Sequence, residues 1–159
     1  MAVKKTDVDK INKLTEEILA NLNVDLKSQV SADLEGVHIN LSGKDSALMI
    51  GFHGENLSAL AYILGLLIRK QVSDEIHFKV DINDYLKEKD KKIRDMTQRA
   101  ISKVRKSGFP EEIRDLNPYE RRIAHMQVAK EGLLSESKGY GKERVFVVKP
   151  KGVIDEESS

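Results

Sequence analysis

The long apolar segment at residues 55–70 constrains the fold of this chain more than any other stretch. It reads "ENLSALAYILGLLIRK", and its apolar residues fall on nearly every side of a helix. A helix that is apolar nearly all round must be covered on more than one face. Its longest predominantly apolar run, residues 57–68, has 12 residues, whereas a helix that spans a membrane needs about 20. The segment is therefore expected to be the core helix of a globular domain.

Two glycines three positions apart, Gly51 and Gly54, stand directly before this helix in the stretch "IGFHGENL". Glycine has no side chain to keep a ligand away, and it accepts positive φ angles. A helix-GxxG-helix turn can therefore present bare N–H groups and a helix N-terminus to a phosphodiester chain. Glycine pairs also mark ordinary turns between helices, so the spacing alone leaves both interpretations open.

The first half of the chain alternates helical and strand patterns. Residues 7–22 place apolar side chains three or four positions apart, at Val8, Ile11, Leu14, Ile18 and Leu22, and Thr6 or Asp7 is available as the N-cap. Alternation of apolar and polar residues predicts strands. The expected order after the first helix is strands at 24–30 and 36–42, a short helix at 44–50, the core helix, and a strand at 76–82.

The second half begins with a long helix at 84–107 that carries nine Lys and Arg residues. Its inward stripe is Leu86, Ile93, Met96, Ala100, Ile101 and Val104. A short strand is expected within 112–116. Asn117 then opens another helix, because Asn at the N-cap, Pro118 at the first position and Glu120 at the third form a capping box. A hairpin is expected at residues 133–149, and a loose acidic tail at residues 151–159.

Charge is divided unevenly although the net charge is only +1. Residues 1–83 carry 9 Lys/Arg against 12 Asp/Glu (−3), residues 84–150 carry 17 against 11 (+6), and the tail carries 1 against 3 (−2). A basic half suggests a polyanionic partner, although Lys-rich helices are often simply solvated. The chain has no Cys, which excludes disulfides and thiolate sites. Its first residues lack an apolar signal, so we expect a soluble, cytoplasmic protein without membrane insertion.

Catalytic motifs are absent from the sequence. It contains no Walker-type phosphate loop, no HExxH, no GxSxG and no dinucleotide-binding glycine fingerprint. The four histidines, at 38, 53, 77 and 125, are scattered, and the carboxylates form no recognisable pair. We therefore expect no enzyme activity, no metal site and no cofactor.

Two motifs in order give the chain a family resemblance. The expected order α-β-β-α-GxxG-α-β over residues 7–82 resembles a type II KH domain. The stretch "LNPYERRIAHMQVAKE" resembles the R-3-H single-stranded nucleic-acid-binding domain, named for an Arg and a His separated by three residues. A KH domain followed by an R-3-H domain is similar to the bacterial Jag family, also called KhpB or EloR. The resemblance implies an α/β (α+β) fold, with a three-stranded sheet and packed helices in each domain.

The domain boundaries expected from this resemblance are 1–83 for the KH domain and 84–150 for the R-3-H domain, which includes the basic helix 84–107. Residues 151–159 would follow as a flexible tail. Many members of the family carry a further N-terminal Jag domain and a basic linker, and this chain is expected to lack both.

The R-3-H resemblance singles out Arg121 and His125, which lie on one helix face, one turn apart. Arg offers a planar fork of donors for phosphate, and His can donate a hydrogen bond or stack on a base. The structural alternative is that Arg121 pairs with a carboxylate and His125 packs against Val128. By the same resemblance Arg122, and Lys142 and Arg144 of the hairpin, are candidate backbone contacts, or are merely solvated.

The glycine turn departs from the family pattern. Family members usually carry a basic residue between the glycines, whereas this chain has Phe52 and His53, followed by Glu55. A neutral His53 can still donate a hydrogen bond. Phe52 is open to two interpretations, a ring that stacks on a base or a residue of the core. Most ionic attraction is therefore expected from the second half of the chain.

These features predict a non-catalytic protein that binds single-stranded RNA. Gly51 to Gly54 would hold about four nucleotides, Arg121 and His125 would engage the same or another strand, and exposed cations of the long helix would add salt-sensitive attraction: Lys87, Lys91, Lys92, Arg94 and Arg99. The resemblance implies a post-transcriptional regulator or RNA chaperone linked to cell elongation and division, with a small KH protein as partner. The alternatives are a protein-interaction adaptor with a degenerate turn, using helix 55–70, and a binder of single-stranded DNA.

Overall fold

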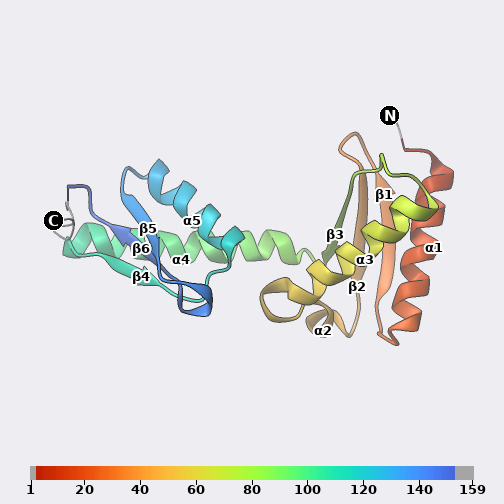
Figure 1. Ribbon diagram of the computed structural model, residues 1–159, viewed down its shortest axis with the longest axis horizontal. Helices are drawn as coiled ribbons and strands as arrows, with labels where there is room; N and C mark the ends of the chain where they lie inside the picture. The colour runs from red at the N-terminus through yellow and green to blue at the C-terminus, as the bar shows by residue number, and fades with distance from the viewer. Residues whose placement is uncertain (1–2, 153–159) are drawn as a thin grey trace. The chain divides into compact units, whose positions relative to one another are not determined.

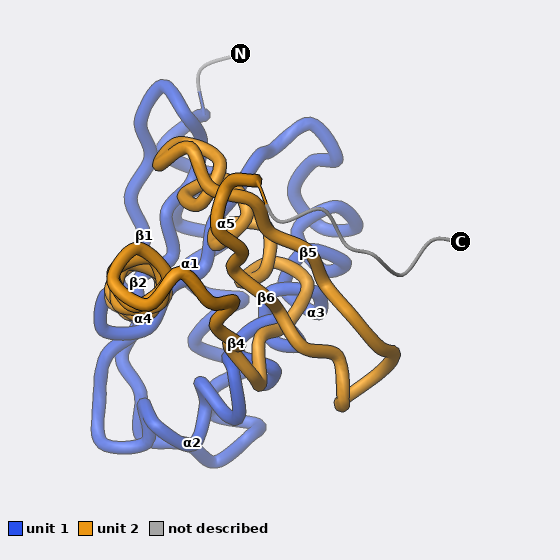
Figure 2. The backbone as a smooth tube through the Cα atoms, turned by 90° about the vertical axis from the view of Figure 1, so that its left-hand side faces the viewer, with its two compact units in different colours: residues 1–86 blue, residues 87–159 orange. Residues whose placement is uncertain are grey.

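The computed structural model describes residues 3–152, and the chain divides into two compact units between Leu86 and Lys87 (Figure 2). Each unit contains one three-stranded sheet with helices packed against it. The mixed α/β fold expected from the sequence is confirmed. The expected tail lies mainly in residues 153–159, outside the described part of the chain.

Unit 1 is built from seven elements along the chain, and Figure 1 labels its helices and strands. They are α1 (Lys5–Asn21), β1 (Lys27–Ala32), β2 (Val37–Ser42), α2 (Ser46–Ile50), the single 3-10 turn η1 (Phe52–Gly54), α3 (Glu55–Gln71) and β3 (Phe78–Ile82). The sheet order is β1-β2-β3, with β1 antiparallel and β3 parallel to β2. Because β2 and β3 run parallel, the chain must cross over between them, and α2, η1 and α3 form that crossover.

The core of unit 1 lies between the sheet and helices α1 and α3. Along β2 the apolar residues Val37, Ile39 and Leu41 are buried, and the polar residues between them are not. Helix α1 packs against β1, α3 packs against β3, and the two helices contact each other. The sheet therefore has one covered face, and the polar side chains of β2 lie on the other.

Helix α3 corrects the expectation that residues 55–70 are covered on more than one face. Its buried stripe contains Leu57, Leu60, Leu64 and Ile68, whereas Tyr62, Ile63 and Leu66 are exposed. A single sheet layer with two helices has only one interior, so one stripe of the helix is buried and the opposite stripe faces outward.

Three details of the first half were also predicted wrongly. Helix α1 begins at Lys5, and its N-cap is Lys4 without a side-chain hydrogen bond, so neither Thr6 nor Asp7 is the cap. Leu22, expected in the buried stripe, is exposed because the helix ends at Asn21 and Leu19 takes the buried position. The first strand begins later than expected, at Lys27, because Asn23 turns the chain with a positive φ of 53°.

Unit 2 consists of the rest of α4 (Tyr85–Ser107), β4 (Glu111–Ile113), α5 (Pro118–Lys130), β5 (Leu134–Lys138), the turn η2 (Gly141–Glu143) and β6 (Val145–Lys149). The order β4-β6-β5 is antiparallel throughout. The expected hairpin at 133–149 and the short strand near 112–116 are both present. One shared core joins α4, α5 and the sheet through Ile101, Ala124, Val128, Phe146 and Val148.

The capping box at the start of α5 is confirmed. The Asn117 side chain accepts a hydrogen bond from the Glu120 backbone N–H at 2.9 Å, and the Glu120 carboxylate accepts one from the Asn117 N–H at 2.8 Å. Pro118 occupies the first helical position, where its missing N–H costs nothing. Within residues 3–152 no helix has the length and apolar character that a membrane crossing requires.

The one-sided burial of α3 predicts different costs for two isoleucines of the same helix. Ile68→Ala should lower the free energy of unfolding by about 2–5 kcal/mol, because the side chain is fully buried in the unit 1 core. Ile63→Ala should change it by less than about 0.5 kcal/mol, because Ile63 is exposed. Urea unfolding followed by circular dichroism measures both. Equal losses would show that the outward stripe of α3 is covered.

Candidate nucleic-acid interface

The glycine turn before α3 uses backbone conformations that favour glycine. Gly51 has φ 70° and ψ −171°, and Gly54 has φ 80° and ψ 17°. A Cβ atom on Gly51 would approach the Asn56 side chain to 2.6 Å, and one on Gly54 would approach the Tyr85 ring to 3.0 Å. Asn56 is itself fixed, since its amide donates to the Leu48 carbonyl at 2.8 Å. The fold alone therefore requires both glycines, and substitutions of them would disturb unit 1 as well as any ligand.

The two residues between the glycines lie at the surface of the turn. Phe52 is 74% exposed, so the interpretation of Phe52 as a core residue is wrong. Its ring meets the His53 ring edge to face, with centroids 4.2 Å apart. His53 has a positive φ of 52°, an uncommon conformation for a residue with a side chain. An exposed aromatic ring at this turn is available to stack on a base.

Helix α3 starts immediately after the turn, with Gly54 as its N-cap and no side chain capping it. The first N–H groups of a helix carry partial positive charge and are suited to a phosphate. Glu55 in the first turn works against an anion there. The turn thus offers an aromatic ring and backbone donors, but little positive charge.

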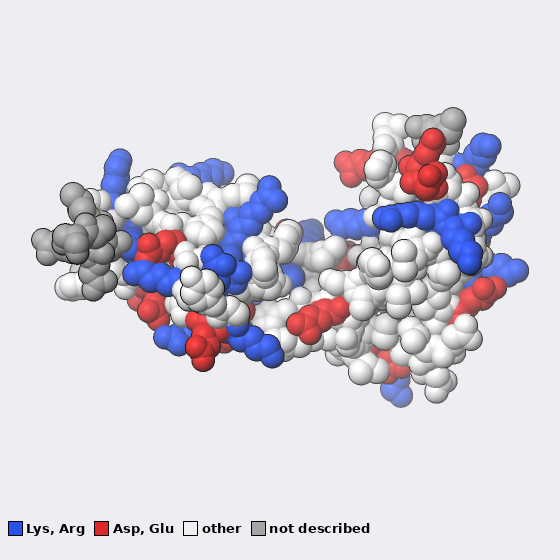
Figure 3. Space-filling model, viewed as in Figure 1, with Lys and Arg blue, Asp and Glu red and all other residues white. Residues whose placement is uncertain are grey.

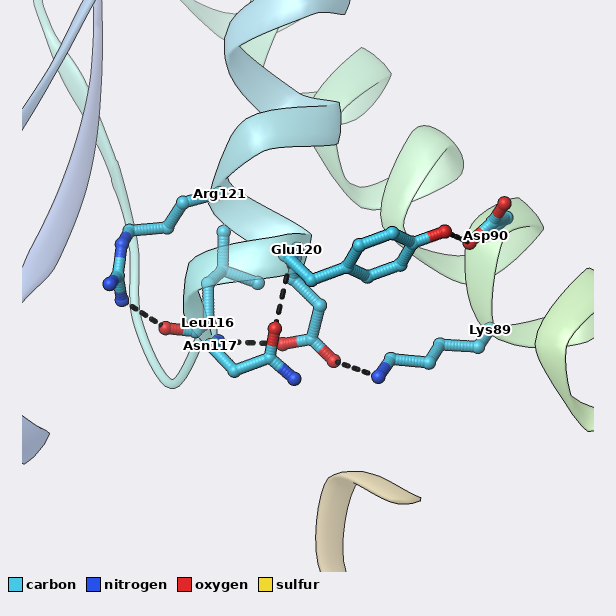
Figure 4. Close-up of polar contacts among 7 residues, drawn as sticks. Lys89, Asp90, Leu116, Asn117, Glu120 and Arg121 are labelled. Atoms are coloured by element: carbon cyan, nitrogen blue, oxygen red, sulfur yellow. Dashed lines mark hydrogen bonds and ion pairs between the residues drawn. The ribbon is translucent and has the colours of Figure 1, made fainter. Parts of the chain in front are cut away.

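The second candidate surface surrounds α5, whose N-terminus is held on α4 (Figure 4). The Glu120 carboxylate, 3% exposed, lies 3.4 Å from the Lys89 ammonium, and the Tyr119 hydroxyl donates to Asp90 at 3.1 Å. Lys89 also lies over the Tyr119 ring, 5.5 Å from its centroid. These contacts give Lys89 a structural role and fix the turn of α5 from which Arg121 projects.

Arg121 is half-buried and donates a hydrogen bond from Nη1 to the Leu116 carbonyl (Figure 4). This bond uses one of the five N–H groups of the guanidinium, and the others are not needed for it. Within residues 3–152 Arg121 forms no ion pair with a carboxylate, so the sequence-based alternative for this residue is not observed. The backbone contact orients the guanidinium without neutralising its charge.

His125 is held by strand β5. Its Nδ1 lies 2.8 Å from the Ser135 hydroxyl and its Nε2 lies 3.2 Å from the Ser137 hydroxyl, while its ring meets Phe146 edge to face at 4.6 Å. Burial, together with the positive charges of Arg121 and Arg144, lowers the pKa of His125 from its usual 6.5. A neutral imidazole donates through one nitrogen and accepts through the other, which matches two serine hydroxyls.

Two arginines act electrostatically on His125. Both guanidinium groups disfavour protonation of the imidazole, so both lie close enough to it for their charges to act. Arg121 comes from α5, and Arg144 comes from the end of η2 next to β6. Guanidinium groups bind phosphate through charge-assisted hydrogen bonds, so two such charges near one neutral imidazole favour a phosphate group.

The remaining predicted contact residues are exposed cations. Lys91, Arg94 and Arg122 are exposed, as are Lys87, Lys92, Arg99, Lys142 and Arg144. By contrast, Lys103 and Arg105 are paired with Glu111 and Glu131 at 2.9 and 2.8 Å. Figure 3 shows Lys and Arg side chains distributed among acidic ones on the visible face of each unit. No group of three or more potential metal ligands occurs in the described part of the chain.

Sequence reasoning missed the residues that hold His125. Ser135 and Ser137 are two apart on β5 and therefore point to the same face of the sheet. Their partners Val148 and Phe146 on β6 belong to the core, so this face is the one that α5 covers. The Ser-x-Ser spacing on an expected strand was visible in the sequence, but the register that places it beneath the helix was not.

A known family of domains matches the second half of the chain. Residues 91–150 match the family model of the R-3-H domain, so the R-3-H prediction for the second half of the chain is confirmed.

The chain is also similar to a curated protein, the RNA-binding protein KhpB of Clostridium symbiosum, with 29% identity over 124 residues. The similarity covers 77% of this chain and 56% of that relative, so the chain spans little more than half of the relative's length.

The environment of His125 predicts its titration. Its ring signals in a two-dimensional NMR titration should show a midpoint below 6.5, and Arg144→Gln should raise this midpoint by removing one of the two positive charges. Because the pKa in the folded state is below that in the unfolded state, this residue stabilises the fold above about pH 6.5, and the contribution is lost as pH falls through the folded-state pKa. Arg114→Gln, at an exposed pair with Glu112, is the control. A midpoint at or above 6.5 would contradict this environment.

Proposed function

We propose that this protein binds single-stranded RNA without catalysing a reaction, in the manner implied by its resemblance to KhpB. The observation that carries the proposal is the arrangement of Arg121, His125 and Arg144 in unit 2, within the region that matches the R-3-H model. A phosphate placed there would meet two guanidinium groups, each with free donors. A relative that is named as an RNA-binding protein supports RNA as the polyanion.

Unit 1 is proposed to be a type II KH domain that contributes a second contact. Its α-β-β-α-turn-α-β order, with the Gly-x-x-Gly turn between two helices, supports this assignment. In this proposal the backbone of residues 51–54 lies along about four nucleotides and Phe52 stacks on a base. Because the turn lacks a basic side chain, unit 1 orients the strand, and the cations of unit 2 supply most of the ionic attraction.

The proposed cellular role is post-transcriptional regulation or RNA chaperoning in the cytoplasm, linked to cell elongation and division. A small KH protein is the proposed partner. The competing proposal is an adaptor that binds proteins, and the observation in its favour is the outward apolar stripe of α3. A third possibility is a preference for single-stranded DNA, since no described group is dedicated to reading a 2′-hydroxyl.

A fluorescence anisotropy titration tests the RNA proposal. Labelled single-stranded RNA should bind saturably, and its affinity should fall with salt. Arg144→Gln should reduce the slope of log affinity against log salt by about 0.7, because one phosphate contact is lost. Arg114→Gln is the matched control, because it also removes one positive charge from unit 2, at an exposed ion pair with Glu112. It should leave the slope unchanged.

For unit 1 the matched pair is Phe52→Ala and Tyr62→Ala, two exposed aromatic residues of which only the first lies in the turn. Phe52→Ala should weaken binding by roughly 1–3 kcal/mol, and Tyr62→Ala should not. Both keep the glycines that the fold requires. Absence of saturable binding by the parent protein would refute the RNA proposal and favour the adaptor. Unlabelled DNA of the same sequence, used as a competitor, decides between the two nucleic acids.

A further inference from the structure

The tip of the β5–β6 hairpin carries the most exposed aromatic side chain of the described chain. Tyr140 is 93% exposed, and within residues 3–152 it takes part in no hydrogen bond or ring contact. Its backbone is extended, at φ −132° and ψ 152°. Nothing in the core of unit 2 therefore requires an aromatic ring at this position.

Two glycines flank Tyr140 and shape the tip. Gly139 has φ 87° and Gly141 has φ 60°, both in the region that glycine tolerates best. No heavy atom outside the neighbouring residues lies within 4 Å of the position that a Cβ on Gly141 would occupy. The ring thus stands beside backbone without side chains, where another molecule can approach both the ring and the chain.

The surroundings of the ring are basic. Lys138 precedes it, and Lys142 and Arg144 follow it, against the single carboxylate of Glu143. Lys138 is paired with Glu136 at 2.8 Å, whereas Lys142 and Arg144 form no ion pair among residues 3–152. Proteins that bind single-stranded nucleic acids combine exposed aromatic rings with unpaired cations. The rings stack on the bases, and the cations attract the phosphate backbone.

The loop between β5 and β6 also begins and ends beside the proposed phosphate site. Ser137, three residues before Tyr140, contacts Nε2 of His125 at 3.2 Å. Arg144, four residues after it, lies close enough to His125 for its charge to lower the pKa of the ring. Three residues span at most about 10 Å, so the tip lies within reach of a strand whose phosphate contacts Arg121 and Arg144.

The other exposed aromatic residues of unit 2 are less suitable. Tyr119 is hydrogen-bonded to Asp90 and lies beneath Lys89. Phe109 is 73% exposed and lies in the turn after α4. It has a glycine on one side only, since Gly108 precedes it and Pro110 follows it. Among the described residues of unit 2, Tyr140 alone combines a free ring, flanking glycines and adjacent cations.

We propose that Tyr140 is a base-stacking residue, whose ring packs against an unpaired base of the RNA strand that contacts Arg121, His125 and Arg144. The inference rests on the proposed RNA-binding function and adds a contact to it. Stacking uses the face of the base, which all bases possess, so Tyr140 contributes affinity for unpaired strands without selecting a base. A base within a duplex has both faces covered and cannot be reached in this way.

Tryptophan fluorescence tests the contact directly, because the chain contains no Trp. Tyr140→Trp introduces a single reporter, and its emission should change on saturation with an unlabelled single-stranded RNA. Phe109→Trp places a single Trp at another exposed site of unit 2, and its emission should stay unchanged.

Affinity provides the second measurement. Tyr140→Ala should weaken RNA binding by roughly 5- to 150-fold, and Tyr140→Phe should bind like the parent, because stacking needs the ring and not the hydroxyl. The exposure of the side chain predicts that all variants fold, which circular dichroism checks. If the parent binds RNA and Tyr140→Ala binds equally well, the stacking role is wrong and the proposed function stands. If the parent itself does not bind, both are wrong.

Discussion

The buried carboxylate of Glu120 fixes the part of the molecule on which its proposed function depends. It accepts a hydrogen bond from the Asn117 N–H, which closes the capping box of α5, and it lies 3.4 Å from the Lys89 ammonium of α4. A charged group with so little exposure is stable only when it is paired and hydrogen-bonded, and removing one partner of such a pair is costly. The carboxylate thereby sets where α5 starts and how it lies on α4. Arg121 and His125 follow in the next turns, so their positions are a consequence of this contact.

The two candidate surfaces use different physical means. In unit 2, burial and the charges of two guanidinium groups lower the pKa of an imidazole. In unit 1, the glycine turn offers an exposed ring and the N-terminus of α3, with an acidic residue beside it. The glycines themselves are required by the packing of Asn56 and Tyr85, so their presence has a structural cause whether or not a ligand binds. The groups of the turn that remain for contact with a ligand are therefore Phe52, His53 and the backbone.

Local patterns in the sequence predicted most of the fold. The capping box at Asn117 was predictable because all its partners lie within four residues. The order of strands and helices followed from periods of two and of three to four residues. The exposure of one stripe of α3 was not predictable. The sequence shows that the helix is apolar on nearly every side, but it does not show how many of those sides other elements will cover.

The site was predictable only in part, for the same reason. Arg121 and His125 are neighbours along one helix, and their proximity follows from the sequence. The serines that hold His125 come from β5, and their contact depends on the register of β5 with β6 and on the packing of α5. The proximity of Arg144 to His125 likewise depends on tertiary structure. A single sequence does not specify such long-range contacts.

An unpaired RNA strand that lies against α5 and the β5–β6 hairpin should be visible when backbone amide shifts are mapped during an NMR titration with single-stranded RNA. We expect the largest changes at the N-terminal turns of α5 and in residues 135–145, with a second set at residues 51–56. Changes confined to the outward stripe of α3, with α5 and the hairpin unaffected, would show that RNA does not bind at this surface.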